Sequence, residues 1–124
     1  MKKVLFISKS KLSHNLLRAL VPLVPTKTDL TCVEGVGDLA HLGKRGKGYQ
    51  LVLADWNIFA GSPDLNEACE AIEKHPLLKG AKRILIHPQK GFEPDRLAGK
   101  GYDFYPKPFE ASELAALIER GLKS

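Results

Sequence analysis

Short runs of apolar residues alternate along the chain with segments in which apolar residues recur every three or four positions. The apolar runs are rich in branched and aromatic side chains and predict five strands, at residues 4–7, 30–33, 51–54, 84–86 and 102–105. The helical spacing predicts five helical segments, one that opens at Ser13 and others over residues 36–44, 64–75, 92–98 and 110–122. The segments at 36–44 and 92–98 are the weak ones, because glycines lie close to them.

Strands that alternate with helices predict a parallel sheet with helices on both faces. The run at residues 51–54 is apolar throughout, as expected of a central strand that is covered on both sides. With right-handed crossovers, a sheet of this size resembles the flavodoxin-like, doubly wound sheet with strand order 2-1-3-4-5. The 124 residues therefore predict one α/β domain, over residues 1–124.

The composition is ordinary for a globular protein, with 44% hydrophobic and 27% charged residues. No apolar run approaches the roughly 18 residues that a membrane span needs. The apolar stretch after Lys2 and Lys3 stops at Ser8, too early for a secretion signal, so we expect a cytoplasmic protein without a membrane partner. Cys32 and Cys69 lack the spacing of metal ligands and are expected to be buried thiols.

The formal net charge of +5 is unevenly distributed. Residues 1–28 hold six basic side chains and no acidic one, whereas residues 29–76 hold eight acids against four bases. Only residues 44–47, Lys-Arg-Gly-Lys, resemble a basic cluster. A basic chain permits contact with nucleic acid, but charges this scattered are more typical of a solvated surface, so nucleic acid is a disfavoured partner.

The residues that follow the strands are the candidate site, because ligands of such sheets bind beyond the carboxyl ends of the strands. Asp55 directly follows the apolar strand at 51–54, and Lys107 stands between two prolines after the last strand. The prolines restrict the local backbone and can aim the ammonium group. Taken singly, Asp55 could cap a loop and Lys107 could be a solvated lysine; together they are a more specific signal.

The order of these segments resembles the receiver domain of two-component response regulators over essentially the whole chain. The resemblance rests on the strand Leu-Val-Leu-Ala-Asp55, on the strand Arg-Ile-Leu-Ile-His87, and on Lys107-Pro108-Phe109 ahead of the last helix. The element that contains Lys107 is its most specific part. In that family the aspartate that matches Asp55 accepts a phosphoryl group from a histidine kinase, and the lysine that matches Lys107 lies in the same pocket.

The resemblance assigns roles to three further positions. Phe104 matches the family's switch aromatic, and Asn57 matches the residue whose backbone carbonyl contacts the metal. His87 stands where the family has threonine or serine. It could be a pH-sensitive group, a metal ligand together with His14, or a hydrogen-bond partner of Asp55, although a plain histidine at a strand end is the commoner case.

The resemblance breaks down at the acidic pair that binds magnesium in the family, because Ser8 and Lys9 stand at those two positions. Magnesium prefers oxygen ligands, usually carboxylates, and phosphoryl transfer relies largely on the metal to neutralise charge. Residues 1–28 contain no acid, so no shift of the alignment restores the pair. We therefore expect no magnesium, no other cofactor and no catalytic residue, and we expect the ammonium groups of Lys9 and Lys107 to approach Asp55 instead.

Three functions follow as hypotheses. The first is an atypical receiver, or pseudo-receiver, that is not an enzyme and acts as a signal-transduction and protein-interaction module. The second is a receiver that still accepts a phosphoryl group on Asp55 from a histidine kinase. The third is a small flavodoxin-like nucleotide-binding protein or enzyme, against which stands the lack of glycine in Ser8-Lys9-Ser10-Lys11 after the first strand.

The family's interaction face corresponds here to the segment from Phe92 to Leu122. Its weak helix and its aromatic and basic side chains suit contact with an acidic protein or with a second copy of the chain, and a histidine kinase is the less expected partner. The side chains concerned are Phe92, Tyr102, Tyr105, Lys90, Arg96 and Lys100. In the alternative reading the aromatic groups belong to the core and the lysines are merely solvated.

Overall fold

The structure is a computed structural model that describes residues 1–43, 46–59, 65–90, 97, 99–107 and 110–123. Its centre is one sheet of five parallel strands in the order β2-β1-β3-β4-β5, which confirms the flavodoxin-like order predicted from the sequence. The strands are β1 (Lys2–Ile7), β2 (Thr28–Val33), β3 (Leu51–Asp55), β4 (Lys82–His87) and β5 (Tyr102–Pro106).

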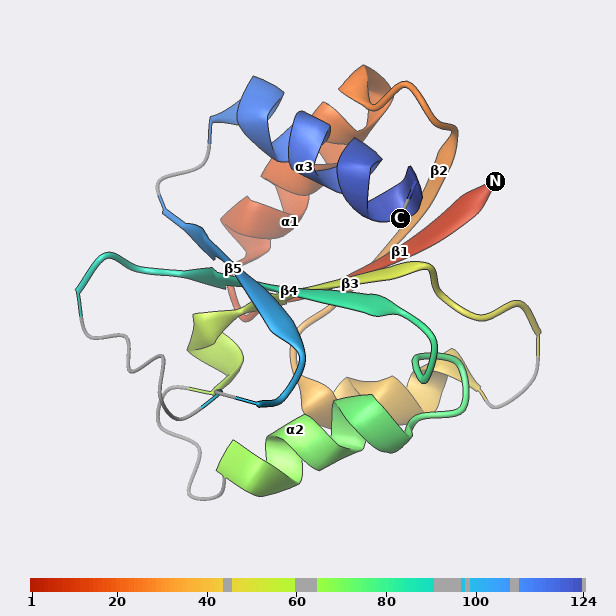
Figure 1. Cartoon of the computed structure of the whole chain (residues 1–124), viewed down its shortest axis with the longest axis vertical. Coiled ribbons are helices and arrows are strands. Elements are labelled where there is room, and N and C mark those ends of the chain that lie inside the picture. The colour runs from red at the N-terminus through yellow and green to blue at the C-terminus, as the bar shows by residue number, and fades with distance from the viewer. Residues whose placement is uncertain (44–45, 60–64, 91–96, 98, 108–109, 124) are drawn as a thin grey trace.

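Helices cover both faces of the sheet (Figure 1). On one face lie α1 (Lys11–Leu20), the 3-10 turn η1 (Val21–Leu23) and α3 (Ala111–Lys123). On the other lie η2 (Val36–Leu42), η3 (Trp56–Ile58) and α2 (Leu65–Lys74). Of the helix predicted at 92–98, only Leu97 is among the described residues, and it is buried.

Alternation along β1 divides the core into two clusters. Leu5 and Ile7 point toward α2, whereas Val4 and Phe6 point toward α1 and α3. Every residue of β3 is buried, which explains why its sequence is apolar up to its last residue. The one charged side chain on this strand, Asp55, is thereby carried into the interior at the carboxyl edge of the sheet.

Two helices begin or end differently from the sequence prediction. The first helix begins at Lys11 rather than Ser13, because the hydroxyl of Ser10 caps it by accepting the backbone N–H of Ser13 at 3.1 Å. The weak helix predicted at 36–44 is a 3-10 helix that ends at Leu42, where Gly43 takes a φ of +76° that other residues rarely adopt.

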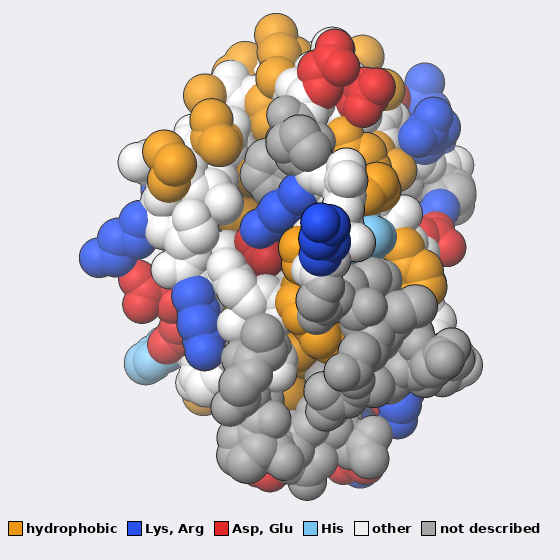
Figure 2. Space-filling view, turned by 90° about the vertical axis from the view of Figure 1, so that its left-hand side faces the viewer, with side chains coloured by type: hydrophobic (Ala, Val, Ile, Leu, Met, Phe, Trp, Pro, Cys, Tyr) orange, Lys and Arg blue, Asp and Glu red, His pale blue; other side chains and the backbone are white. Residues whose placement is uncertain are grey.

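Large hydrophobic side chains are left exposed on one part of the surface. Leu12 and Leu16 of α1 and Leu23 of η1 are 70%, 46% and 60% exposed. Figure 2, which views the carboxyl edge of the sheet, shows hydrophobic side chains gathered over the upper part of the molecule. No helix in the described part of the chain is both long enough and apolar enough to cross a membrane.

Candidate functional site

The Asp55 carboxylate lies at the carboxyl end of β3 and is only 1% exposed. Its Oδ2 atom accepts the hydroxyl of Ser8 and the ammonium of Lys107, each at 3.0 Å. Its Oδ1 atom accepts the backbone N–H of Asn57 at 3.2 Å. Both oxygens of a buried charge are thus satisfied by direct contacts with the protein, as a buried carboxylate requires.

Ser8 joins the strand β1 to this carboxylate. Its hydroxyl donates to Asp55 and accepts the backbone N–H of Ser10 and the side-chain amide of Asn57, both at 3.1 Å. A hydroxyl has one proton and two lone pairs, so these three contacts use its full capacity. Ser8 is 0% exposed, and the network therefore leaves its side chain no unused polar group.

A buried histidine supports the backbone beside Ser8. The Nε2 atom of His14 lies 2.7 Å from the Ser8 carbonyl oxygen, which can only accept, so Nε2 carries the proton. The His14 ring meets Phe6 edge to face, with ring centroids 5.6 Å apart. The contact fixes the turn between β1 and α1, and it occupies one of the two ring nitrogens through which a histidine can bind a metal.

Lys9 contributes its backbone rather than its ammonium. The Lys9 N–H donates to the Asn57 side-chain oxygen at 3.0 Å, while the Lys9 side chain is exposed. Among the residues that the structure describes, Lys107 alone places an ammonium within ion-pair distance of Asp55. The expectation that Lys9 also approaches Asp55 is therefore wrong: the turn after β1 directs the Lys9 side chain into solvent.

Lys107 directly follows the carboxyl end of β5, and its side chain extends from there to Asp55. Its backbone N–H donates to the His87 carbonyl at 2.7 Å, and its own carbonyl accepts the side-chain amide of Gln89 at 3.1 Å. These contacts hold the residue beside the carboxyl end of β4, and its side chain is 33% exposed. The prolines were expected to aim this lysine; Pro106 ends β5, and Pro108 and Phe109 lie outside the described residues.

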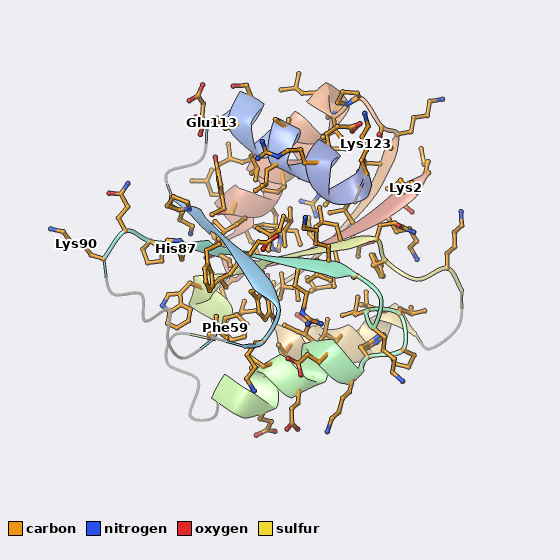
Figure 3. The ribbon with its side chains drawn as sticks, in the orientation of Figure 1. Lys2, Phe59, His87, Lys90, Glu113 and Lys123 are labelled. Carbon is orange, nitrogen blue, oxygen red and sulfur yellow. The ribbon has the colours of Figure 1, made fainter. Side chains whose placement is uncertain are left out.

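His87 lies at the same edge (Figure 3), where its ring contacts that of Phe104. The His87 Nδ1 atom donates to the Pro88 carbonyl oxygen at 2.8 Å, and the His87 ring meets that of Phe104 edge to face at 6.1 Å. Phe104 is 43% exposed. Because Ser8, Asn57 and Lys107 make the recorded contacts of Asp55, the idea that His87 hydrogen-bonds to Asp55 finds no support in the described residues.

The described residues of the pocket offer a magnesium ion few ligands. It offers one carboxylate, and a lysine ammonium already lies 3.0 Å from the Oδ2 oxygen that a cation would seek. Magnesium requires near-octahedral oxygen coordination, and a fixed positive charge beside the same oxygen repels a dication. Among the residues that the structure describes, no group of three or more histidine, cysteine, aspartate or glutamate side chains could hold a metal.

The sequence predicted Asp55, Asn57 and Lys107 as members of one site, and the structure brings these three side chains or backbones together. Sequence reasoning missed the roles of Ser10 and His14. A serine directly before the first turn of a helix, three positions ahead of Ser13, is a recognisable capping signal, and it could have placed Ser10. The His14 contact depends on the turn after β1 and carries no comparable signal.

No family model matches the sequence, and no curated protein matches it either. Many solved structures are similar to this chain, and three of them serve as examples. A response regulator from Thermotoga maritima has 16% identity and a TM-score of 0.75, covering 100% of this chain and 99% of that one. The signal receiver domain of a putative Luxo repressor protein from Vibrio parahaemolyticus has 23% identity and a TM-score of 0.74, covering 98% and 90%.

The third is the receiver domain of a sensor histidine kinase from Pseudomonas aeruginosa PAO1, with a magnesium ion coordinated in its active-site cleft. It has 18% identity and a TM-score of 0.74 and covers 99% of this chain and 98% of that one. At such identities the likeness concerns the backbone, and one fold hosts many functions. The chain therefore has the fold of response-regulator receiver domains.

Proposed function

We propose that residues 1–124 form a receiver-like signalling module of the pseudo-receiver type, which acts through protein contacts without magnesium-dependent phosphorylation of Asp55. One observation carries this proposal: the Asp55 Oδ2 atom already accepts both Ser8 and Lys107 at 3.0 Å. A magnesium ion at that oxygen would have to displace two contacts inside a site that is 1% exposed. Asp55 and Lys107 then form a structural pair that closes the carboxyl edge of the sheet.

The charge balance of the pocket supports the same proposal. Transfer of a phosphoryl group needs positive charge around the phosphoryl oxygens. Phosphoryl-transfer sites usually obtain this charge from a metal ion and a lysine together. Here, of the ammonium groups in the described part of the chain, that of Lys107 alone lies within ion-pair distance of Asp55, and the Lys9 side chain is exposed. Ser8 supplies a neutral hydroxyl where a carboxylate would hold a metal ion. The metal ion, as the second source of positive charge, therefore lacks carboxylate ligands at this position.

The alternative is a receiver that accepts a phosphoryl group on Asp55 from a histidine kinase. The observation that favours it is the ion pair itself, since a lysine 3.0 Å from the acceptor oxygen could also contact a transferred phosphoryl group. The phosphorylatable receiver requires magnesium at Asp55, whereas the pseudo-receiver does not. The affinity of the pocket for magnesium therefore distinguishes the two functions.

A gain-of-ligand variant tests the pocket's role. Ser8→Asp with Lys9→Asp adds two carboxylates to the turn after β1 and should create magnesium affinity measurable by calorimetry. The matched control, Ser8→Asn with Lys9→Asn, changes the same positions without adding carboxylates and should bind no magnesium. If the double aspartate variant folds and still binds no magnesium, these positions are not those of the family's metal pair and the proposal loses its basis.

The interaction face is proposed along the segment from Phe92 to Leu122, with one correction to its aromatic members. Tyr102 is 8% exposed and packs against Phe59, with ring centroids 6.3 Å apart, so it belongs to the core. Tyr105 is partly buried, and its hydroxyl donates to Glu113 at 3.3 Å. Phe104 is the exposed aromatic of this face instead. Phe92 and Arg96 lie outside the described residues.

The apolar surface beside α3 supports a protein partner for this face. A hollow of about 190 Å³ between the first and last helices is lined by Leu16, Ala19, Leu20, Leu23 and Ala111. Contiguous apolar surface of this kind marks contact sites more often than plain solvated surface. It adjoins the start of α3, which belongs to the proposed face.

Sedimentation of the purified chain tests this face with a second copy as partner. The triple variant Lys90/Arg96/Lys100→Glu should weaken association, whereas Asp55→Asn should leave it intact. A control triple variant at exposed lysines elsewhere, Lys11/Lys74/Lys79→Glu, makes the same change of charge and should have little effect. If Asp55→Asn abolishes association while the Lys90/Arg96/Lys100 variant associates normally, the output depends on the Asp55 pocket and the phosphorylatable receiver replaces our proposal.

A further inference from the structure

A basic hollow lies at the amino edge of the sheet, at the opposite end of the strands from Asp55. It has a volume of about 290 Å³, and four of its lining residues are lysines: Lys2, Lys3, Lys27 and Lys47. Among the residues that the structure describes, no acidic side chain lines it. Figure 3 places Lys2 at the far end of the molecule from His87 and Lys90, so this hollow is separate from the candidate site described above.

Three segments that are distant in sequence bring the lysines together. Lys2 and Lys3 open β1, and the Lys2 N–H donates to the Lys27 carbonyl at 3.0 Å. The Lys3 ammonium donates to the Lys47 carbonyl at 3.1 Å and lies 4.4 Å from the centre of the Tyr49 ring. Lys3 therefore connects the segment before β3 to the start of β1. These contacts also fix the position of the Lys3 ammonium.

The charges around the hollow are not compensated by neighbouring acids. Among the described residues, none of the four lysines has a carboxylate within ion-pair distance. Two acids lie on adjoining segments: Asp29, which pairs in register with Lys3, and Glu119, which accepts the Thr26 hydroxyl and pairs with Lys123 at 3.6 Å. A concave site lined by one sign of charge concentrates counter-ions from solution.

We propose that this hollow binds a small oligophosphate anion, such as pyrophosphate, triphosphate or the phosphate tail of a nucleotide. The four lysines that line the hollow bring positive charge to suit the several negative charges of such an anion, and lysine binds phosphate as a point charge. The volume lies near the lower end of ligand pockets, which begin at roughly 300 Å³, and so suits a small ligand. A nucleic-acid strand requires a basic groove that follows its backbone, whereas this hollow is compact.

Calorimetric titration of the whole chain with inorganic triphosphate tests the proposal, and amide shifts at Gly48, Tyr49 and Gln50 locate the binding. The double variant Lys2→Gln/Lys47→Gln should lose at least about tenfold in affinity, which is about 1.4 kcal/mol. Lys2 and Lys47 are exposed, so thermal unfolding should confirm that the variant is folded. The matched control, Lys9→Gln/Lys11→Gln, removes two exposed charges at the opposite edge and should keep the affinity of the unaltered chain.

An equal loss of affinity in both double variants would overturn the proposal, because it would show attraction to net charge rather than to this hollow. Absence of saturable triphosphate binding by the unaltered chain would overturn it as well. A single-stranded oligonucleotide serves as the second probe. If it binds more tightly than triphosphate, with a steep dependence on salt that Lys2→Gln/Lys47→Gln abolishes, the ligand is a nucleic acid and the small-anion proposal is wrong.

Discussion

At the carboxyl edge of the sheet one buried carboxylate is surrounded by donors, whereas at the amino edge four lysines surround a hollow without a carboxylate. Asp55 is 1% exposed, and each of its oxygens is engaged. The lysines at the other edge are mostly exposed and lack ion-pair partners in the described part of the chain. The negative charge at the carboxyl edge of the sheet is therefore paired, whereas the positive charges at the amino edge have no ion-pair partner among the described residues.

This difference has opposite consequences for stability and for binding. A buried, fully paired charge contributes to stability only while its partners remain, and it has little capacity left for a ligand. Exposed like charges contribute almost nothing to stability and favour a counter-ion from solution. The carboxyl edge should therefore respond to mutation as part of the core, and the amino edge as a binding surface.

The largest effect is expected when Asp55 loses its ammonium partner. Lys107→Met leaves a buried carboxylate without its counter-charge and should lower the free energy of unfolding by about 3 kcal/mol. This is the lower end of the range for buried pairs, because the Lys107 side chain is 33% exposed. Urea unfolding measures it. Asp55→Asn in the Lys107→Met background should restore part of the loss, and a variant as stable as the unaltered chain would contradict the pairing.

Removal of the Ser8 hydroxyl should have the next largest effect. Ser8→Ala deprives Asp55 of one donor and leaves the Ser10 N–H and the Asn57 amide without their acceptor. A loss of about 1–3 kcal/mol in the free energy of unfolding is expected, since buried polar groups are left unsatisfied. Ser112→Ala is the matched control on an exposed hydroxyl, and it should change stability little. Equal effects of the two substitutions would show that the Ser8 network is not needed.

Glu119, beside the amino edge of the sheet, is expected to make a pH-dependent contribution to stability. The Thr26 hydroxyl and backbone N–H donate to its carboxylate and lower its pKa below the usual value of about 4.3. Because the folded pKa is depressed, the stability that Glu119 contributes is present above the unfolded pKa and is lost as pH falls through the folded value.

Glu119→Gln should therefore reduce stability at neutral pH, and the difference from the unaltered chain should shrink as the pH falls below about 4. Thermal unfolding across a pH series measures this difference. Thr26→Val removes the hydroxyl donor and should reproduce part of the change. A difference that grows on acidification would contradict the assigned direction of the pKa shift.

The smallest effect is expected at the lysine hollow. Lys2→Gln/Lys47→Gln should change the free energy of unfolding by no more than about 0.5 kcal/mol, because both side chains are exposed and unpaired. Any change should be a gain that fades in high salt, since like charges repel less once two of them are removed. A loss comparable with that of Lys107→Met would show that the lysines are structural and would remove the contrast between the two edges.

The sheet and its order could be predicted because each strand has its own apolar run and right-handed crossovers leave few topologies. Asp55 and Lys107 could be paired in advance because the carboxyl ends of parallel strands meet at one edge. The direction of the Lys9 side chain depends on the turn after β1, and the burial of Tyr102 depends on packing with Phe59, so neither was accessible from local sequence.

The lysine hollow was also inaccessible from sequence. Residues 44–47 stood out as the basic cluster, yet Lys47 meets Lys2, Lys3 and Lys27, which lie 20 or more positions away from it. Their proximity follows from the positions of β1 and β3 as neighbours in the sheet. The distribution of charges along the sequence therefore did not reveal that these four lysines lie close together in the structure.

Titration of the unaltered chain with magnesium, with and without beryllofluoride, tests the central claim most directly. Trp56 is the sole tryptophan and directly follows Asp55, so its fluorescence reports on the pocket, and the Asn57 amide shift provides an independent signal. With Ser8 and Lys107 bound to Asp55, neither signal should change at physiological magnesium, and beryllofluoride should add nothing. A saturable change below a few millimolar magnesium, centred on Asp55, Asn57 and Lys107, would contradict the account.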